Sequence, residues 1–109
     1  MPDLTLSRFP EHFELIRANT RANKQFVVGK FSLTYGQLFD RIGQVSGFFK
    51  QNNLRVGDRV VICTADEGES TILYLASLYC GLTSVFIDPR GSLSETVLLL
   101  DAAVPRAVF

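Results

Sequence analysis

The sequence has little of what common catalytic and metal sites require. Its 109 residues contain no tryptophan, one histidine and two cysteines. A structural zinc site needs about four Cys or His ligands, and a disulfide framework needs several cysteine pairs, so both are excluded. We expect Cys63 and Cys80 to be reduced, buried thiols of a cytoplasmic protein. A Ser-His-Asp or Cys-His site would depend wholly on His12, for which we expect a packing or surface role.

An excess of charge of one sign is also missing. Eleven Lys and Arg balance eleven Asp and Glu, so no basic surface is expected to bind nucleic acid. Residues 1–13 are charged and have no apolar centre, which argues against a signal peptide. The charge-free run 71–87 is shorter than a typical membrane span and contains Ser77 and Gly81. It predicts a buried helix followed by a buried strand, and no membrane span.

Apolar residues, by contrast, are abundant. Hydrophobic residues make up 47% of the chain, nine of them phenylalanine, and the mean hydropathy is +0.19. A domain this small has much surface and little interior. The composition therefore indicates either an unusually rich core or a surface that something else covers.

The first half of the chain predicts a helix, a hairpin and a second helix. Phe13 and Ile16 fall at helical spacing in a segment that ends at residues 19–20, and the runs 25–28 and 31–33 flank a Gly-Lys turn. Thr34 and Gln37 have the spacing of a capping box for a helix that ends at residues 52–53. Its apolar residues form one stripe: Leu38, Ile42, Val45 and Phe49.

Two glycines in this second helix, Gly43 and Gly47, each lower its intrinsic stability by about 1 kcal/mol relative to alanine. We interpret them as positions where another backbone approaches closely.

The second half predicts a parallel βαβαβ unit over about residues 58–109. Apolar strands at 59–63, 83–87 and 106–109 alternate with helices at 70–80 and from Ser92 or Ser94 to about residue 103. Crossovers of this length require parallel strands with right-handed connections. The fold class is therefore α/β, and we expect residues 1–109 to form a single domain.

The helix at 70–80 is apolar on all sides, which is typical of a buried helix. One three-stranded layer can cover only one of its faces. We therefore expect this helix to be partly exposed or masked by a second copy, and we attribute most of the apolar excess to it and its flanking strands. The chain is then a piece of a larger α/β protein.

Two loops are candidates for ligand binding. The acidic residues Asp66, Glu67 and Glu69 have oxygen ligands suited to a hard cation, but a solvated loop that favours the next helix N-terminus is the preferred interpretation. The segment Asp88–Ser92 follows a parallel strand and enters a helix, where free amides and Arg90 would bind an anion. A plain turn with a helix cap is preferred there too. No glycine-rich phosphate-binding motif occurs.

Three strings, in order, resemble signatures of the adenylate-forming (AMP-binding) enzymes. They are Leu-Thr-Tyr-Gly-Gln-Leu at 33–38, Val-Gly-Asp-Arg-Val at 56–60, and Leu-Tyr-Cys-Gly at 78–81 leading to Ile-Asp-Pro at 87–89. The departures from the family pattern are Gln37 for Glu, Val56 for Pro, and Tyr79, Cys80 and Phe86 for Lys, Ala and Pro. The matched residues have structural roles as caps and turns: Thr34, Gly57, Gly81, Asp88 and Pro89.

The resemblance covers residues 33–109 and implies the N-terminal subdomain of an enzyme that activates a carboxylate with ATP and Mg²⁺. Such enzymes usually pass the acyl group to coenzyme A or a phosphopantetheine arm. The resemblance places the family's phosphate loop, its adenine and Mg²⁺ segments and its catalytic lysine outside these residues. We therefore assign no catalytic, cofactor-binding or metal-binding residue to this chain.

Three functions are consistent with these features. The first is an inactive piece of an acyl- or aminoacyl-activating ligase, whose partner is the remainder of the parent enzyme. The second is a free-standing interaction module, in which exposed apolar surface or a sheet edge binds a partner or a second copy. The third is a small binding protein that uses the loop Asp88–Ser92.

Overall fold

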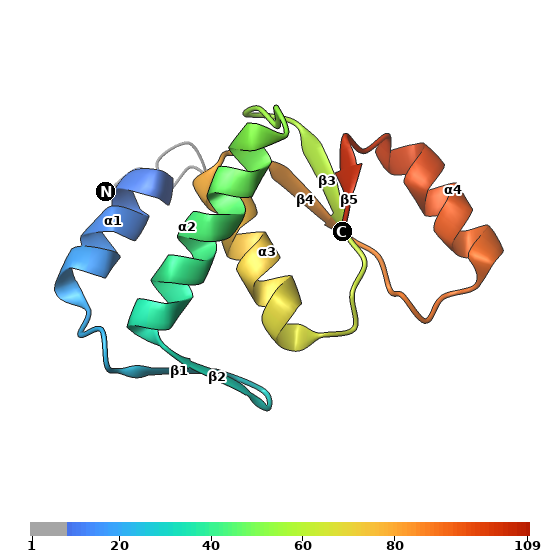
Figure 1. Cartoon of the computed structure of the whole chain (residues 1–109). Coiled ribbons are helices and arrows are strands. Elements are labelled where there is room, and N and C mark those ends of the chain that lie inside the picture. The colour runs from blue at the N-terminus through green and yellow to red at the C-terminus, as the bar shows by residue number, and fades with distance from the viewer. Residues whose placement is uncertain (1–8) are drawn as a thin grey trace, which may run out of the picture.

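The computed structural model describes residues 9–109 and shows helices on both faces of a small parallel sheet (Figure 1). The segment that argues against a signal peptide, residues 1–13, lies mostly outside the described residues. The elements, in chain order, are α1 (Phe9–Asn19), β1 (Gln25–Val28), β2 (Phe31–Thr34), α2 (Tyr35–Gln51), β3 (Arg59–Ile62), α3 (Glu67–Tyr79), β4 (Thr83–Phe86), α4 (Leu93–Ala103) and β5 (Ala107–Val108).

The parallel βαβαβ unit is confirmed. Its strand order is β4-β3-β5, with Arg59 opposite Thr83 and Val60 opposite Ala107. The central strand β3 is covered on both faces, since Val60, Val61 and Ile62 are at most 1% exposed. The chain runs from β3 out to β4 and then back past β3 to β5. Right-handed crossovers in these two directions place α3 and α4 on opposite faces of the sheet, as Figure 1 shows.

The predicted hairpin and capping box are also present. Strands β1 and β2 pair antiparallel, and Gly29 occupies the left-handed region at φ +57° in the turn between them. The Thr34 hydroxyl accepts a hydrogen bond from the Gln37 amide, and the Gln37 side chain accepts one from the Thr34 amide, at 3.2 and 3.0 Å. Helix α2 ends at Gln51, with Asn52 as its C-cap, followed by Asn53 at φ +61°.

The interpretation of Gly43 and Gly47 is wrong. A Cβ at either position would have no atom within 4 Å, so no backbone approaches there. The close approach occurs at Gly68 in α3, where a Cβ would overlap the Phe31 ring of the hairpin. A glycine within a helix pattern does not by itself identify what surrounds it.

Helix α3 begins three residues earlier than predicted, at Glu67, because Asp66 caps it. It packs against the sheet on one side and against α2 and α1 on the other, and Ile72 and Ala76 are fully buried. Partial exposure is confirmed at Tyr74, which is 39% exposed. The second helix layer nevertheless covers a face that we expected to be open.

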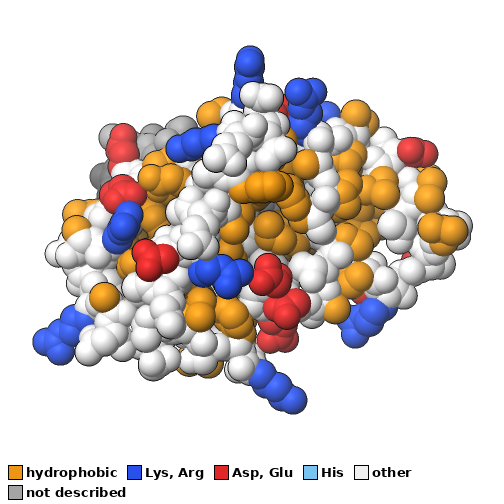
Figure 2. All heavy atoms as spheres, in the orientation of Figure 1, with side chains coloured by type: hydrophobic (Ala, Val, Ile, Leu, Met, Phe, Trp, Pro, Cys, Tyr) orange, Lys and Arg blue, Asp and Glu red, His pale blue; other side chains and the backbone are white. Residues whose placement is uncertain are grey.

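Among the described elements, α4 has the most exposed large hydrophobic residues, which corrects the placement of the apolar excess on the 70–80 helix. No residue of α4 is buried, and Leu93 and Leu98 are 81% and 70% exposed. Only three short strands lie beneath α4, one of them two residues long. Figure 2 shows hydrophobic side chains gathered in the middle of the visible face, over the sheet region between α2 and α4.

Within the described residues, no helix is both long and apolar enough to cross a membrane.

Candidate functional site

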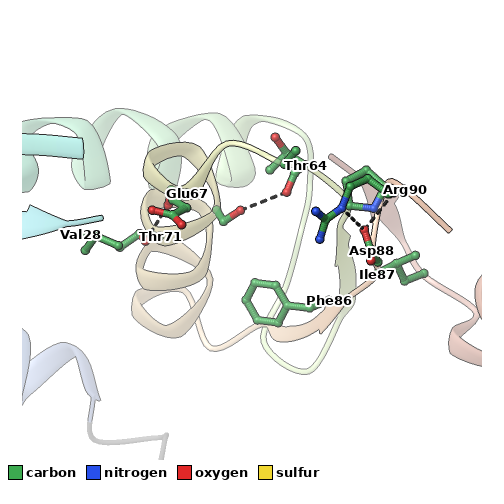
Figure 3. Close-up of a pocket in the computed structure, with 11 residues that line it drawn as sticks. Val28, Thr64, Glu67, Thr71, Phe86, Ile87, Asp88 and Arg90 are labelled. Carbon is green, nitrogen blue, oxygen red and sulfur yellow. Dashed lines mark hydrogen bonds and ion pairs between the residues drawn. The ribbon is translucent and has the colours of Figure 1, made fainter. Parts of the chain in front are cut away.

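The clearest candidate site is a cleft at the carboxyl edge of the sheet. The loops after the neighbouring strands β3 and β4 leave for opposite faces, and ligands of open α/β sheets bind in crevices of this kind. The cleft has a volume of about 640 Å³. Thr64 follows β3, Phe86 and Arg90 belong to β4 and its loop, and Glu67 and Thr71 come from α3 (Figure 3).

The predicted anion-binding loop is organised around its own carboxylate. Asp88 Oδ1 accepts hydrogen bonds from the Arg90 amide at 2.9 Å and from Arg90 Nε at 3.2 Å. The bonds from the Arg90 amide and side chain lower the pKa of Asp88, so the carboxylate stays ionised. Figure 3 shows the two side chains against each other at the edge of the cleft. The guanidinium therefore already has a counter-ion.

Two further amides at this loop are engaged in local hydrogen bonds. The Gly91 amide donates to the Asp88 carbonyl at 3.1 Å, and the Glu95 amide donates to the Ser92 hydroxyl, the N-cap of α4, at 3.2 Å. These bonds describe a turn followed by a helix cap, which is the interpretation that the sequence favoured. For the third function, a binding protein built on this loop, Arg90 and the Gly91 amide are therefore already used within the turn.

The acidic residues before and in α3 have local roles. Asp66 accepts from the Glu69 amide at 2.9 Å as the N-cap, and Glu69 pairs with Arg41 of α2 at 3.2 Å. The Glu67 carboxylate lies against Gly29 of the hairpin turn. No group of three or more His, Cys, Asp and Glu side chains that could hold a metal ion occurs among residues 9–109.

The residues set aside in the sequence analysis lie in the packed layers. His12 is half-buried on α1. Cys63 and Cys80 are free thiols, and both are half-buried, which is less than we expected. The Cys80 thiol donates to the Ser46 carbonyl at 3.9 Å.

The sequence did not predict a small cleft whose wall includes a buried hydroxyl group. A cleft of about 210 Å³ lies between α1, α2 and α3, and Ser46 on its wall is 3% exposed, with no hydrogen-bond partner for its hydroxyl in the described structure. Serine is common on helix surfaces, and nothing in the sequence around Ser46 indicates that a neighbouring helix covers it.

The family motifs sit at caps and turns, as expected. Thr34 is the N-cap of α2, Gly57 and Gly81 have φ of +89° and +72°, and Asp88 and Pro89 form the turn after β4. Gly57 donates its amide to the Gly81 carbonyl at 2.9 Å, which joins the two motifs that contain them.

Comparison with known proteins agrees with these motifs. The profile of the AMP-binding enzyme family matches residues 15–109, a longer stretch than the motifs alone cover. This chain belongs to that family of adenylate-forming enzymes. A search of curated protein sequences returned no match.

Solved structures of the family share the fold. A benzoate CoA ligase from Burkholderia xenovorans LB400 superposes with a TM-score of 0.78 at 24% identity, over 92% of this chain and 20% of that chain. ATP-bound MatB from Rhodopseudomonas palustris gives 0.79 at 24%, over 96% and 21%. The NpsA N-terminal subdomain from Klebsiella oxytoca gives 0.78 at 22%, over 92% and 26%. The chain thus spans about a fifth of the enzymes that it matches, and the match to NpsA lies within an N-terminal subdomain.

Proposed function

We propose that this chain is the N-terminal part of an ATP-dependent ligase that activates a carboxylate as its adenylate. The observation that carries the proposal is the family match over residues 15–109, combined with coverage of only about a fifth of the matched enzymes. The proposal extends to ATP and Mg²⁺ as cofactors of the whole enzyme, to coenzyme A or a phosphopantetheine arm as acyl acceptor, and to a cytoplasmic location.

The described residues do not fit a nucleotide or Mg²⁺ site of their own. Arg90 at the large cleft is paired with Asp88, the Gly91 and Glu95 amides are used within the turn and the cap, and the acidic residues Asp66 and Glu69 cap and pair locally. We therefore derive no chemical step on this chain, and we propose that its 109 residues alone do not catalyse adenylation.

The role that the structure supports is architectural. The chain supplies a parallel sheet whose carboxyl edge is open, and it leaves two apolar surfaces uncovered. One is the outer face of α4, and the other is a groove of about 410 Å³ lined by Phe48, Phe49, Leu73 and Phe109. Apolar surfaces of this kind mark places where another part of a protein packs. The remainder of the parent enzyme is the proposed partner for both.

Carboxylate-dependent exchange of pyrophosphate into ATP tests the claim of inactivity. We expect the purified 109-residue chain to give no exchange above the enzyme-free background with a panel of aliphatic, aromatic and amino acids. Exchange that depends on one of these acids would overturn the claim.

The coding sequence after residue 109 tests the assignment to a longer ligase. A Ser-, Thr- and Gly-rich loop containing a lysine, some tens of residues downstream, would support it. A stop codon directly after residue 109 would favour the alternative function.

That alternative is a free-standing interaction module, and the exposed leucines of α4 are the observation in its favour. Such a module associates with a partner or with a second copy through this face. Light scattering of the wild type and of Leu98→Lys measures self-association. A concentration-dependent dimer that this substitution dissociates would support the module, and a well-folded monomer at all concentrations would count against it.

A further inference from the structure

The apolar groove on α2 continues into a second hollow. The groove of about 410 Å³ and a hollow of about 230 Å³ share Phe48 and Phe109 in their walls. Phe48 is 50% exposed, and the Phe109 ring packs against Phe49 with the ring centroids 5.4 Å apart. The combined surface, which we call the α2 groove, follows α2 from Arg41 to Asn52, a length of about 16 Å. A helix of about three turns has the same length.

The α2 groove has a basic residue at each end. Arg41 lines one end and pairs with Glu69 of α3 at 3.2 Å, whereas Arg106 lines the other end. Arg106 is exposed and lies beside the exposed Arg59, because its amide donates to the Arg59 carbonyl at 2.7 Å. Within residues 9–109 no ion pair joins Arg106 or Arg59 to a carboxylate, and no described residue that lines the groove is acidic. The groove therefore favours an apolar partner that carries carboxylates.

Helix α4 has the complementary chemistry. Leu98 is 70% exposed, and Glu95 and Asp101, three residues before and after it, are exposed on the same face of the helix. The helix contains no basic residue, and Asp101 lies near its C-terminus, where the helix dipole is negative. With 11 residues, α4 is about as long as the groove. A leucine between two carboxylates thus matches an apolar groove between two arginines.

The α4 helix of the same chain is not placed to reach this groove. It covers one face of the sheet, whereas α2 and α3 lie on the other (Figure 1). The matching helix must therefore come from another copy. Each copy has one groove and one α4, so a dimer with two-fold symmetry contains the contact twice.

From this complementarity we propose that α4 of a second copy docks in the α2 groove. Leu98 packs against the Phe48 ring. Asp101 pairs with Arg106, which directs the N-terminal end of the docked helix toward Arg41. The proposal rests on the alternative function, of which it names the receiving surface, and it applies to the 109-residue chain, where both surfaces are uncovered.

Sedimentation velocity over a concentration series of the 109-residue chain tests the proposal. We expect a reversible dimer. Asp101→Arg and Arg106→Asp should each raise its dissociation constant about tenfold or more, because each brings like charges together. The double variant should restore the dimer, because the pair forms again with its charges exchanged. Arg21→Asp, between α1 and β1, reverses a charge away from the groove and should leave the dimer unchanged.

The apolar contact is tested with Phe48→Ala and Leu98→Ala. Each should weaken the dimer about tenfold or more, because each removes buried apolar area from a contact that occurs twice. Leu15→Ala is the matched control, since Leu15 is 63% exposed and lies on α1, and it should have no effect. Circular dichroism and thermal unfolding of every variant establish that the monomer is folded, so that a loss of association reports on the contact.

Three outcomes would overturn the proposal. They are a monomer at all concentrations, a dimer that Arg106→Asp and Phe48→Ala leave intact, and a double charge variant that associates no better than the single variants. The first also counts against the alternative function, whereas the other two leave it standing. None of them bears on pyrophosphate exchange, so the proposals fail separately.

Discussion

Replacing glycine by alanine is expected to have opposite effects in α2 and α3. At Gly43 the added methyl group would meet no atom within 4 Å. Alanine is favoured over glycine in a helix interior by about 1 kcal/mol, so Gly43→Ala should stabilise the chain by about that amount. At Gly68 the same methyl group would overlap the Phe31 ring, and Gly68 is itself buried.

The expected cost at Gly68 follows from its place in the fold. Gly68 is the second residue of α3, so alanine gains little there from helix propensity. The overlap involves the inner atoms of the Phe31 ring, which cannot move without shifting strand β2 or rotating the whole side chain. Overpacking of this kind costs about 1–3 kcal/mol. We therefore expect Gly68→Ala to destabilise the chain by about 1–2 kcal/mol.

Urea unfolding followed by far-UV circular dichroism measures both effects as shifts of the midpoint at constant slope. The double variant Gly68→Ala with Phe31→Ala tests the cause, because removing the ring removes the overlap. The two substitutions should be non-additive, and Gly68→Ala should cost little once Phe31 is alanine. A neutral Gly68→Ala, or an equal cost in the presence and absence of the ring, would refute the packing of the hairpin on α3.

Three further predictions concern a helix end, a titrating group and a cap. Val104 ends α4 at φ +46° and is 66% exposed, so Val104→Gly should raise stability by about 1 kcal/mol in thermal unfolding, because a β-branched residue is strained there. Burial, then the hydrogen bond to Glu14, raises the pKa of Tyr79 above 10.0. Its contribution is full below about pH 10 and is lost as the pH rises through the raised pKa, so the wild type should lose more stability than Tyr79→Phe as the pH is raised above about 10 in urea unfolding. Asp66→Ala should cost about 1 kcal/mol by the same assay and Asp66→Asn much less, since Asn also caps helices.

Features set by neighbouring residues in the sequence were predictable. The capping box of Thr34 and Gln37 depends on two side chains three residues apart, and it occurs as predicted. The buried central strand β3 follows from its unbroken apolar run, and the parallel order follows from the length of the crossovers. The same holds for the turn at Asp88, whose hydrogen bonds all lie within residues 88–91.

Features that depend on distant segments were not predictable. The sequence places Gly43, Gly47 and Gly68 in helices, but only the fold brings the Phe31 ring to one of them and leaves the others open. Ser46 is buried because α1 and α3 lie across α2, and no pattern around Ser46 records that. The cleft between α1, α2 and α3 is made of such long-range relations, which explains why sequence reasoning found the turn at Asp88 and missed the cleft.

The apolar residues of this chain show that the hydropathy of a helix does not determine how deeply it is buried. Helices α3 and α4 are both rich in apolar residues, yet α3 has the sheet on one side and α2 on the other, whereas α4 rests on three short strands and has no buried residue. Burial is therefore set by the number of neighbouring layers and not by the hydropathy of the helix itself. A sequence alone counts the apolar residues correctly but assigns the excess to the wrong helix. If the proposed function is correct, the exposed leucines of α4 belong to a surface that the rest of the enzyme covers. The matched benzoate CoA ligase is long enough for this, because this chain spans only 20% of it.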